Sequence, residues 1–159
     1  MKGPLFYAKI LLFGEYGIIK DSKGLAIPFS SYKGALKSSS NLSGEALKSN
    51  KNLIKLYDYL EANASELVSF DFTSFKNDIG SGMYFHSSIP QGYGVGSSGA
   101  LVASIYDQYA HNKITILENL TRDKLLKLKE IFSFMESFFH GKSSGLDPLN
   151  SYLSLPILI

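Results

Sequence analysis

The chain of 159 residues is long enough to fold as one domain around a hydrophobic core. Hydrophobic residues make up 45% and charged residues 19%, as in ordinary globular proteins. The formal net charge of +2 is too small to indicate nucleic acid or an anionic membrane as a partner. The absence of cysteine excludes disulfides, thiolate metal sites and thiol catalysis.

The first predicted element is a strand over residues 5–13, where apolar and aromatic side chains continue up to Gly14. The apolar run over residues 10–13 is too short for the core of a signal peptide and for a membrane span. We therefore expect a cytoplasmic protein that does not bind a membrane.

Two short strands are expected next, over residues 24–29 and 32–37. Pro28 should place the first of them at a sheet edge or a strand end, because proline lacks the N–H of a ladder bond. The stretch Ser38 to Asn52 is rich in Ser, Asn and Lys and is predicted to be a solvated loop.

A short amphipathic helix is predicted after this loop, from apolar residues at helical spacing, namely Leu53, Leu56, Tyr57 and Leu60. Residues 83–89 alternate as a strand does and end at Pro90, and residues 97–111 read as a helix. The clearest helix follows Thr121, a plausible N-cap, with Asp123 in its first turn. Its apolar stripe consists of Leu125, Leu128, Phe132, Met135 and Phe139.

The last residues, 153–159, form an apolar run. Chain ends are usually polar unless they are docked, so we expect the start of a buried strand whose continuation is missing; the alternative is an unusually packed chain end. The elements together predict one α+β domain over residues 1–159, with helices collected on one side of a mostly antiparallel sheet.

The candidate functional feature is the glycine-rich segment of residues 90–100, PQGYGVGSSGA, between a predicted strand and a predicted helix. Gly92, Gly94 and Gly96 permit positive φ and leave no Cβ between backbone and ligand. Several N–H groups can then point at one anion beside the helix N-terminus, and Ser97 and Ser98 add hydroxyls for phosphate or magnesium. The alternative is a capped glycine loop without a ligand.

This segment is neither of the common nucleotide loops. No Gly-Lys-Ser/Thr follows at the spacing of a P-loop, so the loop supplies no lysine. The acidic residue that a dinucleotide-binding unit has about twenty residues further on is also absent.

Three segments in order resemble the GHMP kinases, and most closely their mevalonate kinase branch. Residues 90–100 resemble the family's phosphate loop, PxxxGLGSSAA. Residues 8–16, AKILLFGEY, are similar to the opening GKVILFGEH, and residues 140–147, HGKSSGLD, are similar to HGxPSGxD. The three matches span nearly the whole chain. The resemblance implies the GHMP N-terminal domain fold, which is ribosomal protein S5 domain 2-like.

The resemblance also implies a role for each matching position. Asp147 would be the catalytic carboxylate, with Lys9 beside it near the acceptor hydroxyl. Glu15 and Tyr16 would lie on the substrate side. Glu136, eleven residues before the aspartate, and Ser98 would hold Mg²⁺. The phosphates of ATP would bind the loop residues Pro90, Gly92, Gly94, Val95, Gly96, Ser97, Ser98, Gly99 and Ala100.

Plainer interpretations remain for some of these residues. Lys9 fits an edge strand and Glu136 a solvent-facing helix position, whereas Asp147 before Pro148 fits a helix N-cap. His140 is interpreted as structural.

Three positions depart from the family pattern. Tyr16 replaces a histidine, Ser143 a proline and Gly99 an alanine. The glycine should cost up to about 1 kcal/mol at a helix start.

The expected activity is ATP-dependent phosphorylation of a small-molecule alcohol, most closely mevalonate in isoprenoid precursor synthesis. The alternatives are another GHMP kinase acting on a sugar, homoserine or phosphomevalonate, and a non-catalytic fragment or ligand sensor. The family's second, C-terminal domain is expected to be missing from this chain. A homodimer is possible, and no nucleic-acid partner is expected.

Overall fold

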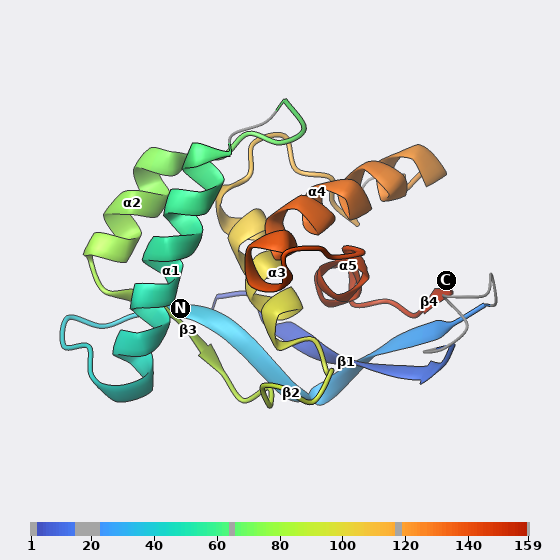
Figure 1. Ribbon diagram of the computed structural model, residues 1–159, viewed down its shortest axis with the longest axis horizontal. Helices are drawn as coiled ribbons and strands as arrows, with labels where there is room; N and C mark the ends of the chain where they lie inside the picture. Colours follow the sequence, from blue (N-terminus) through green and yellow to red (C-terminus); the bar gives the residue numbers. More distant parts are fainter. Residues whose placement is uncertain (1–2, 15–22, 64–65, 117–118, 159) are drawn as a thin grey trace.

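The computed structural model describes residues 3–14, 23–63, 66–116 and 119–158. Within these ranges the elements follow in the order β1 (Phe6–Phe13), β2 (Leu25–Ser38), α1 (Gly44–Ala62), α2 (Phe72–Gly80), β3 (Met83–Ser87), α3 (Ser97–Tyr109), α4 (Arg122–His140), α5 (Leu146–Leu153) and β4 (Ile157–Leu158). Figure 1 shows the strands as a lower layer with the helices above them. The predicted α+β architecture is therefore confirmed.

The sheet is antiparallel throughout and its strand order is β1-β2-β3, with β4 also paired to β2. The two short strands predicted for residues 24–37 are wrong as separate elements, because β2 is one strand of 14 residues. Pro28 pairs with Lys9 on β1. On its other side β2 pairs with β4 only at residues 25–26 and with β3 only at residues 34–38. Pro28 therefore lies where, among the described residues, β2 has one neighbouring strand, as proline requires.

Helix α1 overturns the prediction of a loop from Ser38 to Asn52. The helix begins at Gly44, directly after Ser43, and its first half carries the polar residues that suggested a loop. Asn50 is buried, and its Nδ2 donates to the carbonyl oxygens of Ile79 (3.1 Å) and Met83 (2.7 Å). The polar residues suggested a loop because most side chains in the first half of α1 are exposed to solvent, and such a segment can still be helical.

Helix α2 has no counterpart among the predicted elements. Asp71 is its N-cap and accepts from the backbone N–H of Ser74 at 3.0 Å, while Phe75 and Ile79 are buried. Helices α3 and α4 confirm the predictions for residues 97–111 and beyond Thr121. The Thr121 hydroxyl accepts from the N–H of Lys124 at 3.2 Å, as an N-cap does.

The hydrophobic core has two parts. The larger lies among the helices and includes the predicted stripes of α1 and α4. The smaller lies between the sheet and α3 and consists of Phe6, Ala8, Ile89, Ala100 and Ala103. Because Ile89 precedes the glycine-rich segment and Ala100 is its last residue, this smaller cluster anchors both ends of that segment.

The C-terminal strand exists but is less buried than expected. β4 pairs with Leu25 and Ala26 of β2, whereas Leu158 is 64% exposed. None of the helices in the described ranges is long and apolar enough to cross a bilayer.

Candidate functional site

The glycine-rich segment leaves β3 and enters α3 through three residues with positive φ. Gly92, Gly94 and Gly96 have φ values of 81°, 68° and 83°, and Gly96 is the left-handed N-cap of α3. A residue with a Cβ would be strained at each of them. The free N–H groups of the first turn and the positive end of the helix dipole make this loop a candidate main-chain anion site.

The edge of the sheet holds this loop in place. The N–H of Lys9 on β1 donates to the carbonyl oxygen of Val95 at 2.9 Å. A Cβ on Gly96 would lie 3.1 Å from Cγ of Lys9, so the lysine stem lies directly against the loop. Lys9 is therefore fixed at the loop by its backbone and by its side chain.

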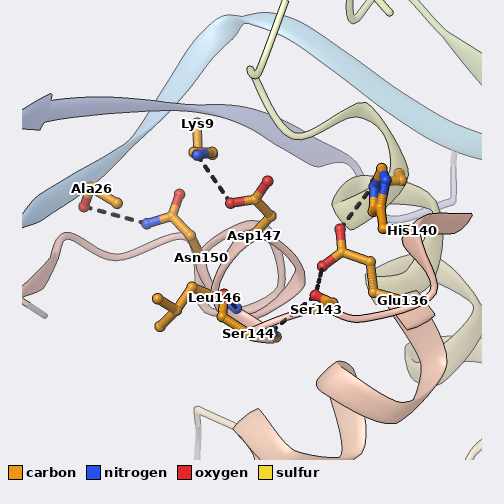
Figure 2. A network of polar contacts seen from close by, with 11 residues as sticks. Lys9, Ala26, Glu136, His140, Ser143, Ser144, Leu146, Asp147 and Asn150 are labelled. Carbon is orange, nitrogen blue, oxygen red and sulfur yellow. Dashed lines mark hydrogen bonds and ion pairs between the residues drawn. The ribbon is translucent and has the colours of Figure 1, made fainter. Parts of the chain in front are cut away.

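The Lys9 ammonium reaches across to the first turn of α5. Its Nζ lies 2.9 Å from Oδ1 of Asp147, and the two side chains are 13% and 34% exposed. Figure 2 shows this pair above the start of α5. The N-cap of α5 is Gly145, so the interpretation of Asp147 as the N-cap is wrong; the carboxylate lies in the first turn instead.

Gly99 explains how Asp147 comes so close to α3. A Cβ on Gly99 would lie 2.7 Å from the carbonyl carbon of Asp147 and 2.8 Å from the nitrogen of Pro148. These distances are shorter than side chains tolerate, so the backbones of α3 and α5 pack directly on each other. The glycine therefore has a packing function that offsets its low helix propensity.

Glu136 is buried on α4, at 3% exposure, and does not face solvent. Its Oε1 accepts from Oγ of Ser98 at 3.0 Å and its Oε2 accepts from Oγ of Ser143. Burial raises the pKa of Glu136 above its ordinary value, and the charge of Asp147 adds to this; the hydrogen bonds from Ser143 and Ser98 act in the opposite direction.

Two residues join the site in ways the sequence analysis missed. Nε2 of His140 lies 3.0 Å from Oγ of Ser98, so this histidine contacts the loop. Ser143 was noted only as a departure from the family pattern, yet its hydroxyl binds Glu136. A serine seven residues after the glutamate, across a helix end, gives no periodic signal that would have identified it.

A groove with a volume of about 620 Å³ lies along the glycine-rich segment and reaches Ser98, His140 and Asp147 of this cluster. Its walls combine the glycine-rich segment, His140 and Asp147 with the first half of α1. The lining residues of α1 are Glu45, Ala46, Lys48, Ser49 and Asn52. A larger hollow of about 760 Å³ lies against β2 and β3. It contains none of the predicted site residues, and the groove is the candidate site because charged and main-chain groups converge there.

The oxygens at the loop fit a magnesium ion that is also bound by phosphates. Within the described ranges, no group of three or more His, Cys, Asp or Glu side chains is placed to hold a metal ion. Magnesium in nucleotide sites commonly takes one or two protein oxygens and completes its shell with phosphate and water. Oε1 of Glu136 and Oγ of Ser98, 3.0 Å apart beside the loop, are oxygens of the kind that such a site uses.

The structure thus brings together the predicted residues Lys9, Ser98, Glu136 and Asp147 with the loop. Glu15 and Tyr16, predicted for the substrate side, lie outside the described residues.

The fold is an α+β domain with a glycine-rich loop at a helix N-terminus, and the comparisons with known proteins give its family. The chain belongs to the GHMP kinases, because the family model "GHMP kinases N terminal domain" matches residues 52–154. Among solved structures it is similar to mevalonate kinase from methicillin-resistant Staphylococcus aureus, with 21% sequence identity and a TM-score of 0.48. That match covers 96% of this chain and 50% of the other, so this chain spans about half the length of that enzyme. No curated protein matches the sequence.

Proposed function

We propose that residues 1–159 form the nucleotide-binding domain of an ATP-dependent kinase that phosphorylates a small-molecule alcohol. The observation that carries this proposal is the ion pair of Lys9 and Asp147, placed beside a main-chain anion site. Phosphoryl transfer requires positioning and charge stabilisation more than covalent chemistry by the protein. An acidic and a basic group next to bound phosphates meet this requirement.

The phosphates of ATP would bind at the loop, and the nucleoside would extend along the groove toward α1. The groove volume of about 620 Å³ lies within the range of small-molecule sites. Polar side chains at its α1 wall, such as Lys48 and Asn52, offer hydrogen-bonding groups on that side.

Glu136 and Ser98 would hold magnesium, which would neutralise charge on the phosphates. The buried carboxylate of Glu136 favours this role, because a buried negative charge is costly unless a cation or hydrogen bonds compensate it.

Asp147 would orient the acceptor hydroxyl and receive its proton, while Lys9 supports the negative charge of the carboxylate and faces the developing charge of the transferred group. Gly99 places the backbone of Asp147 against α3, so the carboxylate is held at a fixed distance from the loop. Both side chains are partly exposed, which leaves room for a substrate to reach them.

For the acceptor we propose mevalonate, phosphorylated at its primary hydroxyl to 5-phosphomevalonate. The support is the resemblance of residues 8–16 to the opening segment of mevalonate kinases. Sugar, homoserine and phosphomevalonate are the competing acceptors within the family.

The test is an ADP-release assay on the full-length protein with ATP and Mg²⁺, across mevalonate, phosphomevalonate, homoserine and galactose. The proposal predicts turnover with mevalonate that exceeds the others at least tenfold. Turnover with a different acceptor would refute mevalonate as the substrate but would still support a kinase. ATP binding without turnover of any acceptor would favour a ligand sensor.

A further inference from the structure

We propose that Ser143 is a positioning residue that binds one oxygen of Glu136 permanently and so leaves the other, Oε1, as the oxygen that faces magnesium. This inference rests on the proposed function and assigns a division of labour within its metal site. It starts from the hydrogen bonds that surround the two serines in contact with Glu136.

The direction of the Ser143 hydrogen bond is fixed by its surroundings. Oγ of Ser143 accepts from the backbone N–H of Gly145 at 3.1 Å. The single hydroxyl proton is therefore free for Oε2 of Glu136, which accepts it. The backbone carbonyl of Ser143 in turn accepts from Oγ of Ser133 on α4 at 2.5 Å. The residue is thus held by its main chain as well as by its side chain.

Ser98, on the opposite side of the carboxylate, has no such fixed direction. Its Oγ lies 3.0 Å from Oε1 of Glu136 and 3.0 Å from Nε2 of His140. Its proton can point to either partner, depending on the histidine tautomer. Oε1 is therefore the oxygen that can exchange its hydrogen-bond partner for a cation, while Oε2 stays with Ser143. In Figure 2, the side chain of Glu136 lies between those of Ser143 and His140.

The turn that carries Ser143 is itself specified by the sequence. Gly145 has φ of 75°, and a Cβ there would lie 2.2 Å from the carbonyl oxygen of Lys129 and 2.7 Å from the nitrogen of Ser133. The turn consequently packs on the backbone of α4, where only glycine fits. This contact brings the N–H of Gly145 to the Ser143 hydroxyl and sets the direction of its donation.

The chemistry of carboxylate ligands gives this arrangement a consequence. Carboxylates that bind metals are commonly fixed by hydrogen bonds from neighbouring groups, and loss of such a partner weakens metal binding by about 10- to 100-fold. Glu136 is buried, so water cannot easily replace the missing donor. Removal of the Ser143 hydroxyl should free the carboxylate to rotate away from the loop.

The experiment measures Mn²⁺ affinity by electron paramagnetic resonance on the full-length protein with saturating ADP and without acceptor. Ser143→Ala is expected to weaken Mn²⁺ binding about tenfold or more. The matched control is Ser144→Ala: Ser144 is exposed, and its Oγ accepts from the N–H of Leu146 at 3.3 Å. This control should bind Mn²⁺ within about twofold of the wild type.

If Ser143→Ala does not fold, Ser143→Cys replaces it, because the thiol keeps the side-chain shape but is a weak donor; Ser144→Cys is then the control. Unchanged Mn²⁺ affinity in the Ser143 variant, or an equal loss in both variants, would overturn the inference alone. A wild-type protein that binds ADP but no Mn²⁺ would overturn the metal site of the proposed function as well.

Discussion

The burial and hydrogen bonding of Glu136 depend on residues that are distant from it in sequence or follow its helix. The residue belongs to α4, whose apolar stripe flanks it, and this position left open whether the side chain faces solvent. The structure buries it and surrounds it with two serine hydroxyls. No pattern in the sequence specifies that burial, because it depends on how the turn after α4 folds back over the helix.

The raised pKa of Glu136 makes stability depend on pH. A carboxyl whose pKa is higher in the folded than in the unfolded state stabilises the fold at pH below the unfolded value, and this contribution disappears as pH rises through the folded value. The contribution of Glu136 to the stability of the metal-free protein is therefore expected to fall as pH rises above about 4.3, the ordinary glutamate value.

Urea unfolding of the wild type and Glu136→Gln over pH 4 to 8 measures this effect. The wild type should lose stability relative to the variant with rising pH, because glutamine does not ionise. A stability difference that does not change with pH would contradict the cause given for the pKa shift.

At the scale of elements, the close approach of α3 and α5 places Asp147 beside the loop. Gly99→Ala adds a Cβ within 2.9 Å of three atoms of Asp147 and Pro148. Although alanine favours helix by about 1 kcal/mol, overpacking at a rigid contact typically costs 1–3 kcal/mol, so a net loss of about 1 kcal/mol is expected.

Gly80→Ala is the matched control for this contact. Its Cβ would have no neighbour within 4 Å, at the last residue of α2. Denaturant unfolding should show lower stability for Gly99→Ala than for wild type, and wild-type or higher stability for Gly80→Ala. Equal effects of both substitutions would show that the α3–α5 contact accommodates an additional Cβ without loss of stability.

Most of the secondary structure could be predicted where a periodic apolar pattern and a cap agree. Helix α4 is the clearest example, since the stripe and Thr121 both mark it. The predictions failed where they rested on amino-acid composition and not on a periodic pattern. The polar first half of α1 was therefore interpreted as a loop. Helix α2 has only two buried residues, Phe75 and Ile79, which is too few to produce a readable period.

At the scale of the whole molecule, the fold brings together three segments that are far apart in sequence. Strand β1 supplies Lys9, the segment after β3 supplies the candidate anion site, and the region from Glu136 to Asp147 supplies two carboxylates. The motifs named individual residues that the structure brings together, and their function stays a prediction. Their mutual contacts could not be predicted, because these depend on glycines at positions 96, 99 and 145 that allow close backbone approach.

We propose that Asp147 acts at the centre of phosphoryl transfer and that the loop binds the nucleotide. These two functions should separate in Asp147→Asn, which keeps the shape of the side chain and removes its charge. The control is Asp123→Asn, an exposed carboxylate in the first turn of α4.

The most direct measurement compares, for the full-length variants, ATP affinity by calorimetry and ADP release with the best acceptor. Asp147→Asn is expected to bind ATP within about threefold of the wild type and to lose turnover by about 10²- to 10⁴-fold, the usual contribution of an acid–base group. Asp123→Asn should match the wild type in both. Turnover by Asp147→Asn within tenfold of the wild type would contradict the catalytic role proposed for Asp147.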